Sequence, residues 1–549
     1  MLLEECRADI ALRLPDWDGI LAPAPPHARA DLALSWPLAA AKKLKKNPIE
    51  IAEESARAFE GAALFERAEP VRPGYLNLHL ALEPLWRNLS DVVASVESYG
   101  RLQPPPREKI LLEFVSANPS GPLHAASGRA AALGDSLAKI MAHLGYRVST
   151  ECYLNDAGRQ VELLGESLRA RHRQSLGEAA EIPEGGYQGA YLADLAQSLG
   201  PEAKDWSAQR FSRFGVEHFI AEHQRDMDLF AVKFDGWFKE TSLHERESWK
   251  AVLEKLRARG KVFEKDGAVW LASSEGASDE TATGDAADDK DRVLVKNDGR
   301  PTYFLMDIAY HQDKMDRGMT QLIDILGADH HGYVPRMKVA MAELGYPPES
   351  FRALVHQMVH LYRGQQLIRM SKRAGEMVLL KELLDEVGRD ACRFFFAMRT
   401  PNSTLKFDIE LAQKKSQENP VFYVQYVHAR ICSIFREAEK SSLSFGGLPS
   451  VEELKRQPQL GSREERDLLV KLAWFPEILK LCVKELSPHH LASYLLELAG
   501  LFHPFYEKCR VVDASAPDVS RARLGLCLGV RLVIEKGLSL LGVSAPQQM

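Results

Sequence analysis

A histidine at position 124 stands where the sequence changes from a strand pattern to a helical pattern. The run Ile110–Val115 is apolar and β-prone, and Asn118–Pro122 then brings two prolines and a glycine, which cannot continue a strand. From about Ser127, apolar residues recur at intervals of three and four as far as Gly145, which predicts a helix with a glycine cap. At such a helix start, free N–H groups and the helix dipole favour phosphate oxygens. His124 is therefore a candidate for a nucleotide site, although a histidine at such a position more often caps the helix or is merely exposed.

Two further segments carry side chains with binding chemistry. Tyr303 and Asp307 are four residues apart and share one face if their segment is helical. A carboxylate and a phenol can together hold a guanidinium or ammonium group, but the residues alone favour an ordinary helix-start acid beside a packed tyrosine. Gln365–Gly375 places Arg369 and Lys372 in a glycine-flanked loop that can reach phosphate.

Aromatic and basic residues that suit contact with nucleic acid lie near both ends of the chain. Tyr423, Gln425, Tyr426 and Arg430 lie on one predicted helix, where aromatic rings can stack on bases and arginine can contact phosphate. An alternative of equal weight is that these residues form part of a tyrosine-rich core. Lys45 and Lys46 end the densest basic run of the chain. Such a run more often forms a solvated helix face than a nucleic-acid contact.

The elements that position these residues follow from their periodicity. The first strand, the His124 loop, the helix and a second strand at 148–152 form a unit whose connection rules predict a parallel crossover, with the loop at the carboxyl end of the strand. Helical patterns at 211–239 and 248–259 follow. The acidic segment 273–291 is too poor in apolar groups to order itself by burial and is predicted to be a mobile loop.

The domain organisation is predicted from the same patterns. Residues 1–105 suggest a small α+β domain, and residues 106–380 suggest a nucleotide-binding domain with an insertion at about 165–290. Residues 381–549 are almost entirely amphipathic helices of bundle-like length.

Composition limits the function further. The 549 residues, of which 45% are hydrophobic and 27% charged, are typical of a soluble globular protein, and no apolar run approaches the roughly 20 residues that cross a bilayer. The first residues do not resemble a secretion signal, so the cytoplasm is expected. Seven cysteines without a C-x-x-C pair argue against a disulfide framework and against structural zinc. A net charge of −6 means that a polyanionic partner must be held by local basic patches.

Taken in order, several segments resemble one protein family. They are EFVSANPSGPLH, YLNDAG, TYFLMDIAYH, GADHHGYVPR, RMSKRAG, ENPVFYVQYVHARICSI and LLGVSAPQQM. The order of these segments resembles the class I aminoacyl-tRNA synthetases, and their details resemble the arginyl-tRNA synthetases over nearly the whole chain. The resemblance implies a Rossmann-like α/β catalytic domain with a parallel sheet and an insertion, flanked by a small N-terminal α+β domain and a C-terminal all-α helical bundle.

The resemblance assigns the ATP-binding and catalytic residues to two signatures. His124 begins the first, where Ser127 stands in place of the family's second histidine. Met370, Ser371 and Lys372 match the core of the second, and Arg369 stands where the family usually has lysine. Ser127 can donate a hydrogen bond but carries no charge, and losing one oriented donor costs about 3 kcal/mol of transition-state stabilisation. Arg129 or the helix N-terminus are the alternative sources of positive field.

The resemblance also assigns substrate contacts. Glu113 and Asn118 fall where the family holds the α-amino and carboxylate end of arginine, and Tyr303 and Asp307 fall where it binds the guanidinium, which reverses the preference stated above. Asp329 and His330 are expected in the same pocket. The residues expected to contact tRNA are Tyr423, Gln425, Tyr426, Arg430, Lys45 and Lys46.

The implied reaction activates L-arginine with ATP and transfers it to tRNA(Arg). The substrates and partners are then L-arginine, ATP with Mg²⁺ and tRNA(Arg), with no membrane partner, and a monomer is expected. Two alternatives are a catalytically silent tRNA-binding relative, suggested by the altered H-A-A-S signature, and a related nucleotidyltransferase acting on another small acid or alcohol. The long helical C-terminal region has no purpose in the second alternative.

Overall fold

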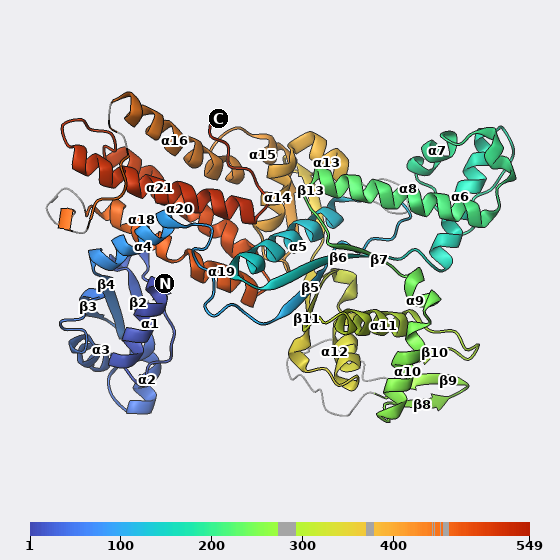
Figure 1. Cartoon of the computed structure of the whole chain (residues 1–549), viewed down its shortest axis with the longest axis horizontal. Helices are drawn as coiled ribbons and strands as arrows, with labels where there is room; N and C mark the ends of the chain where they lie inside the picture. The colour runs from blue at the N-terminus through green and yellow to red at the C-terminus, as the bar shows by residue number, and fades with distance from the viewer. Residues whose placement is uncertain (273–291, 369–377, 442, 444, 451, 454–460) are drawn as a thin grey trace.

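The computed structural model describes residues 1–272, 292–368, 378–441, 443, 445–450, 452–453 and 461–549. The acidic segment 273–291 predicted to be a mobile loop, and the second-signature residues Arg369, Met370, Ser371 and Lys372, lie outside these ranges. The molecule is elongated: the N-terminal unit and the C-terminal helices occupy one end, and a helical insertion forms the other (Figure 1).

A five-stranded parallel sheet lies between the two ends, in the order β12-β11-β5-β6-β7. Its strands are β5 (Lys109–Glu113), β6 (Arg147–Leu154), β7 (Gly236–Lys239), β11 (Gln321–Gly327) and β12 (Phe351–His356). The Rossmann-like parallel sheet expected from the resemblance is thus confirmed.

Helix α5 (Ala125–Leu144) connects β5 to β6 and ends at Gly145 in the left-handed region, with φ of 105°. The helix passes unusually close to the chain that follows β5, because a Cβ on Gly134 would lie 2.3 Å from the Phe114 ring. Nearly every residue of α5 is buried, so this helix is the central core element of the molecule.

The chain between β6 and β7 forms a helical insertion with its own small core. It consists of α6 (Arg159–Ser175), α7 (Ala190–Gln197), η2 (Pro201–Asp205) and α8 (Ala208–Leu229). The structure differs here from the helix expected at 211–239: α8 ends at Leu229, and β7 joins the edge of the central sheet beside β6. The strand pairing supplies its backbone hydrogen bonds, a long-range contact that local periodicity does not reveal.

The segment after β7 contains a second group of elements below the sheet in Figure 1. An antiparallel three-stranded sheet is flanked by helices and leads into the last two central strands. The elements are α9 (Thr241–Glu245), α10 (Ser248–Ala258), β8 (Val262–Lys265), β9 (Ala268–Leu271), β10 (Arg292–Val295), α11 (Tyr303–Asp316), η3 (Ala328–His330), α12 (Tyr333–Glu343) and η4 (Pro348–Ser350).

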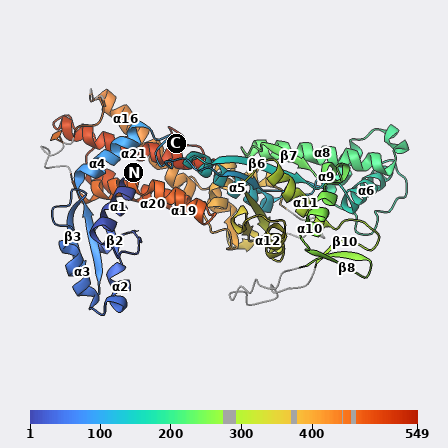
Figure 2. The same ribbon diagram turned by 60° about the horizontal axis from the view of Figure 1, so that its bottom comes forward.

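The N-terminal unit packs around an antiparallel sheet of order β1-β2-β4-β3 and projects to one side of the long axis (Figure 2). Its elements are α1 (Leu2–Arg13), β1 (Ala22–Pro23), η1 (Pro26–Ala28), β2 (Leu32–Leu34), α2 (Trp36–Leu44), α3 (Pro48–Arg57), β3 (Phe65–Val71), β4 (Tyr75–Leu80) and α4 (Leu82–Ala94). Arg466 of the C-terminal helices donates to the buried Asp31 carboxylate, which fixes this unit to the C-terminal region.

The chain after β12 begins with a small mixed sheet and continues as helices. The elements are β13 (Val359–Arg363), β14 (Gln366–Leu367), α13 (Leu380–Val387), α14 (Arg389–Ala397), β15 (Leu405–Asp408), α15 (Ile409–Gln413), α16 (Pro420–Lys440), α18 (Arg463–Ala473), α19 (Phe475–Lys484), α20 (His489–Lys508) and α21 (Pro517–Leu540). The expected helical C-terminal domain and small α+β N-terminal domain are therefore present.

The last residues of the chain are held by buried donors from helices far earlier in the sequence. Arg393 is fully buried and donates to the Leu541 carbonyl at 2.7 Å, and it also pairs with Asp135 of α5. Gln425 donates to the Ser544 carbonyl at 2.9 Å, and His428 Nδ1 donates to the Pro546 carbonyl at 2.8 Å. The C-terminal segment is consequently a structural part of the helical region.

Candidate active site

The central sheet changes winding direction between β5 and β11. From β5 the chain continues through α5 to β6 on one side, whereas β11 continues through α12 to β12 on the other. Ligands of open parallel sheets bind in the crevice outside the carboxyl ends of the strands at such a switch point. The His124 loop follows β5 and the turn η3 follows β11, so the first predicted signature and the turn that carries Asp329 and His330 adjoin this crevice.

The chain leaves β5 through a strained turn. Val115 and Ser116 are consecutive non-glycine residues with positive φ, 72° and 34°. Each such residue costs about 1–3 kcal/mol, and it persists only where its surroundings fix it. Ser116 Oγ donates to Glu113 Oε1 at 2.7 Å and accepts the Tyr153 amide at 3.3 Å, which anchors the turn to β5 and β6.

His124 is the N-cap residue of α5, in extended conformation. Ser127 Oγ lies 3.4 Å from His124 Nδ1, so the two predicted signature residues are adjacent. On the other side, His124 forms an antiparallel bridge with Leu379, and the Leu380 amide donates to the Leu123 carbonyl at 2.8 Å. The chain that returns from the second signature is thus joined to the backbone of the first.

Arg129, the alternative source of charge near His124, is committed elsewhere. Its fully buried guanidinium donates to the backbone carbonyls of Gln357, Thr400 and Ser403 at 2.7–3.0 Å. Burial lowers the pKa of this group to about 10. Of the two alternatives, the α5 N-terminus is therefore the one that remains for a phosphate.

Tyr303 and Asp307 line one cavity of about 340 Å³ beside the switch point. The other lining residues are Val293, Phe304, Tyr333 and Arg336. Burial raises the pKa of Asp307 to about 7, and the nearby carboxylates of Glu113 and Glu240 add to this effect. Tyr303 is 63% exposed at the mouth of the cavity. A cationic ligand that neutralises the Asp307 carboxylate would fit this arrangement.

Behind the cavity, three buried acids form a row across adjacent strands. Asp324 of β11 pairs in register with Glu113 of β5, which pairs with Glu151 of β6. Since residues in register on parallel strands point to one face, all three carboxylates face α11. For β5 and β11, a single acid in an apolar run was the signal for this row in the sequence, whereas the mixed sequence of β6 gave none for Glu151.

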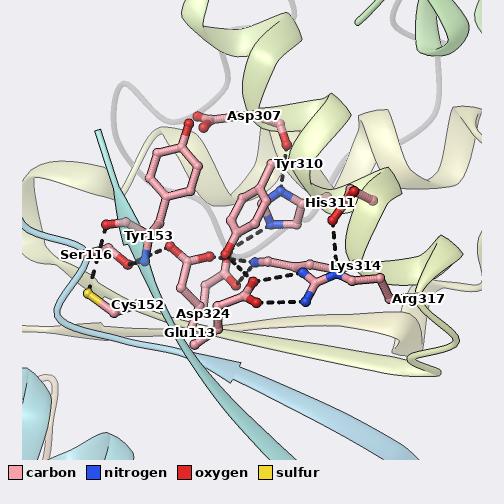
Figure 3. Close-up of polar contacts among 12 residues, drawn as sticks. Glu113, Ser116, Cys152, Tyr153, Asp307, Tyr310, His311, Lys314, Arg317 and Asp324 are labelled. Carbon is pink, nitrogen blue, oxygen red and sulfur yellow. Dashed lines mark hydrogen bonds and ion pairs between the residues drawn. The ribbon is translucent and has the colours of Figure 1, made fainter. Parts of the chain in front are cut away.

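One face of α11 and its C-cap supply the matching cations, as Figure 3 shows. Lys314 Nζ, which is fully buried, lies 2.5 Å from Glu113 Oε2 and 3.1 Å from Asp324 Oδ1. Arg317 binds both oxygens of Glu151 at 2.7 and 2.8 Å, and the Tyr310 hydroxyl donates to the same carboxylate. Burial alone would raise the pKa of Asp324, but Lys314 and His311 together hold it well below its usual range.

Glu113 and Asn118 lie apart from the Tyr303–Asp307 cavity. Both carboxylate oxygens of Glu113 already accept hydrogen bonds, from Ser116 and Lys314, so this residue belongs to the acid row beneath the site. Asn118 is exposed in the loop after β5, and its Nδ2 donates to Gln160 Oε1 at 2.6 Å.

Asp329 and His330 differ from the expectation that they share the pocket of Asp307. Their side chains are 85% and 49% exposed, and neither lines the cavity. The reason is local: the 3-10 turn η3 at the end of β11 directs both side chains outward, 3.8 Å from each other.

The residues expected to contact RNA have different environments. Tyr423 and Tyr426 lie half-buried against His503 of α20, at ring distances of 4.9 and 6.3 Å, and Arg430 lies over the Tyr506 ring. Gln425 instead is buried, with its amide donating to Asp390 and Ser544, so its side chain is inside the protein and not on an RNA-accessible surface.

The two lysines of the basic run lie at the end of α2. Lys45 is exposed and is the helix C-cap in the left-handed region, and Lys46 pairs with Glu54 at 2.8 Å. Both lysines are thus surface charges, which is compatible with a solvated helix face and with contact to tRNA.

Several residues at the site had not been singled out from the sequence. They are His311, Lys314, Arg317, Asp324, Glu151, Tyr333 and Arg336. The signal for His311, Lys314 and Arg317 was a series of polar residues spaced three and four apart after Asp307, which marks one helix face but does not reveal its partners.

The fold and the site define the class of this protein. Residues 88–191 and 198–408 match the family model "tRNA synthetases class I (R), catalytic domain". A methionyl-tRNA synthetase structure from Mycobacterium tuberculosis has the same fold at a TM-score of 0.53, with 11% identity over 80% of this chain and 92% of that one. The protein is a class I aminoacyl-tRNA synthetase, and a catalytic domain of this class implies the use of ATP.

More specific matches extend over the whole chain. Residues 4–80 match the "Arginyl tRNA synthetase N terminal domain" and residues 424–549 the "DALR anticodon binding domain". The arginine–tRNA ligase of Elusimicrobium minutum is 48% identical over 534 residues, which cover 96% of this chain and 95% of the relative. That of Thermotoga maritima is 44% identical, covering 94% of each. The chain belongs to the arginyl-tRNA synthetase family.

A solved structure supports the fold independently. The arginyl-tRNA synthetase of Thermus thermophilus superposes with a TM-score of 0.78 at 24% identity, covering all of both chains. In the part of the chain that the structure describes, no helix has the length and apolar character needed to span a membrane. Within the same residues, no three His, Cys, Asp or Glu side chains gather in a way that could hold a metal ion.

Proposed function

We propose that this protein ligates L-arginine to tRNA(Arg). The observation that carries the proposal is the half-buried carboxylate of Asp307, with its raised pKa, in a cavity beside the switch point of a class I synthetase sheet. The arginine carboxylate attacks the α-phosphorus of ATP, the bond to the bridging oxygen breaks, and pyrophosphate leaves. The arginyl group then passes from AMP to the terminal ribose of the tRNA.

Neither step requires a nucleophilic side chain, so catalysis depends on position and charge. His124 and the α5 N-terminus contact the phosphates, and Ser127 supplies a hydroxyl donor beside His124. By family resemblance, Lys372, with Arg369, Met370 and Ser371, follows the leaving pyrophosphate. Magnesium enters with ATP as part of the substrate complex.

Selection of arginine follows from the cavity. The guanidinium pairs with Asp307 and contacts Tyr303. Asn118 is the candidate for contact with the α-amino and carboxylate end of arginine, and Glu113 acts on that end from the acid row, where both of its oxygens already accept hydrogen bonds. A ligand without a planar cation leaves the half-buried Asp307 carboxylate unpaired, which costs about 1–3 kcal/mol. Asp329 and His330, on the exposed turn after β11, are the candidates for contacts with ATP or with the tRNA end rather than with the guanidinium.

Recognition of tRNA is assigned to the two terminal regions. Residues 381–549 are the anticodon-binding domain, with Tyr423, Tyr426 and Arg430 on its aromatic surface. Residues 1–105 form a second tRNA-contacting domain that includes Lys45 and Lys46, and residues 106–380 form the catalytic domain. The proposal includes a monomeric protein in the cytoplasm without structural zinc.

Arginine-dependent exchange of labelled pyrophosphate into ATP tests this function, measured with and without tRNA(Arg). We expect exchange with arginine and none with lysine or glutamine. The Asp307→Asn variant should lose most of the exchange at low arginine concentration. The control Asp316→Asn should retain it, because Asp316 is the last residue of the same helix and its side chain accepts a hydrogen bond from Gln312. Binding of tRNA without exchange under either condition would refute the enzyme function.

A further inference from the structure

The three α-helices of the insertion each hold one residue of the loop that leads to His124. Gln160 at the start of α6 accepts a hydrogen bond from Asn118 at 2.6 Å. The Tyr191 hydroxyl of α7 donates to the Ser120 carbonyl at 3.1 Å. His223 Nε2 of α8 donates to the Gly121 carbonyl at 2.8 Å. The insertion is therefore in direct contact with the site and is not an independent appendage.

The histidine of these contacts is buried and the tyrosine is half-buried. His223 is 2% exposed, and its carbonyl partner requires hydrogen on Nε2. The Tyr191 ring packs edge-on against Phe219 of α8 at 5.6 Å, and burial raises the pKa of its hydroxyl to about 12, which keeps it a donor. A Cβ on Gly121 would lie 3.0 Å from this ring, so the tyrosine also fits closely against the loop backbone.

These contacts act a short distance from His124. Two residues separate Gly121 from His124, and one of them is Pro122, whose ring fixes φ. On the far side, the Leu123 carbonyl and His124 are held by Leu380 and Leu379. Because the φ of Pro122 is fixed, fewer dihedral angles between Gly121 and His124 are available to absorb a shift of the Gly121 carbonyl. Such a shift therefore changes the position of His124 at the α5 N-terminus.

We propose that Tyr191 and His223 are positioning residues of the catalytic site, which hold the backbone before His124 in the geometry needed at the ATP phosphates. This inference rests on the proposed function. It assigns the insertion a part in adenylate formation through two hydrogen bonds to consecutive carbonyls, at Ser120 and Gly121. The arginine cavity around Asp307 is formed by other elements, so the two residues affect turnover and not arginine selection.

The chain offers matched controls inside the same insertion. His172 of α6 is fully buried and its Nε2 donates to the Gly200 carbonyl at 3.1 Å, the same kind of bond but remote from the His124 loop. Tyr187 is a half-buried tyrosine of the insertion core whose backbone amide donates to Ser167. His172→Leu and Tyr187→Phe therefore disturb the insertion without touching the loop.

The test measures pyrophosphate exchange for Tyr191→Phe, His223→Leu and His223→Gln against these controls. We expect kcat to fall roughly tenfold for Tyr191→Phe and for His223→Leu, because misplacing a catalytic group by a fraction of an ångström lowers the rate by about this factor. The KM for arginine should change less than about twofold, because that pocket is intact. His223→Gln should recover most of the rate, since its amide can donate to the same carbonyl.

A double-mutant cycle with His124→Ala separates positioning from general damage. If the two residues act through His124, their substitutions have almost no further effect on kcat in the His124→Ala background. Equal losses in both backgrounds, or equal losses in the His172 and Tyr187 controls, would overturn the inference. Tyr191→Phe keeps its ring, so the cycle remains measurable if His223→Leu does not fold. Absence of exchange in the parent protein would instead refute the proposed function itself.

Discussion

Replacing Lys314 by methionine tests the row of acids beneath the site. Methionine fills a similar volume without charge, so the perturbation is mainly electrostatic. The Lys314 ammonium is fully buried, 2.5 Å from Glu113 and 3.1 Å from Asp324. Its removal leaves two neighbouring carboxylates without the cation that they share. Breaking a buried pair by removing one partner costs about 3–5 kcal/mol.

The deficit of this variant should depend on pH with a definite sign. In its folded state one of the stranded carboxylates takes up a proton, so that its pKa rises above the unfolded value of about 4. A group whose pKa is raised on folding contributes stability below its unfolded pKa, and that stability is lost as the pH rises toward the folded pKa. The slope is about 1.4 kcal/mol per pH unit. The loss relative to the parent is therefore smaller at pH 5 than at pH 8.

Hydrogen exchange of the amides of β5 and β11 measures this quantity locally, which suits a chain of several domains. Each variant is compared with the parent at the same pH. Lys250→Met is the matched control, because Lys250 pairs with Glu247 at the surface with both side chains more than half exposed. Such a pair contributes about 0–1 kcal/mol. Equal protection in the two variants at pH 8, or a deficit that does not vary with pH, would refute the electrostatic reasoning.

Three further predictions concern single residues. Because the pKa of Asp307 lies at about 7, arginine bound by its ionised form should bind roughly tenfold more weakly at pH 6 than at pH 8; calorimetry measures this, and a flat profile would contradict the assignment. Gln425→Leu should lower the stability of the helical region by about 1–3 kcal/mol, seen in thermal unfolding, with tRNA affinity unchanged; a loss of affinity at parental stability would instead place Gln425 at the RNA. Ser127→Ala should lower kcat for exchange by roughly a hundredfold at constant KM for arginine, and a change confined to that KM would exclude its phosphate role.

The local parts of the site could be predicted from the sequence. The strand, the loop and α5 have distinct periodicities, and Gly145 marks the end of the helix. Tyr303 and Asp307 were expected on one face because their spacing matches a helical turn, and the structure places both on one cavity. These predictions used contacts within a few residues of the chain.

The remaining parts depend on contacts between distant segments. The strand β7 resembles the end of a helix until its pairing with β6 is known. The partners of Glu113 depend on strand register and on the face of α11 that covers the sheet, neither of which is a local property. Gln425 lies on a helix whose periodicity identifies two faces, but the segment that buries it is 119 residues further along the chain.

The buried donors to the C-terminal segment also bear on how the protein is made. The partners of Arg393, Gln425 and His428 are 148, 119 and 118 residues later in the chain. At about 5–20 residues per second on the ribosome, these three side chains wait roughly 6–30 s for their carbonyls. The helical region therefore cannot complete these three contacts during translation until residues 541–546 have left the ribosomal tunnel. A chain truncated before Leu541 would never form these three bonds.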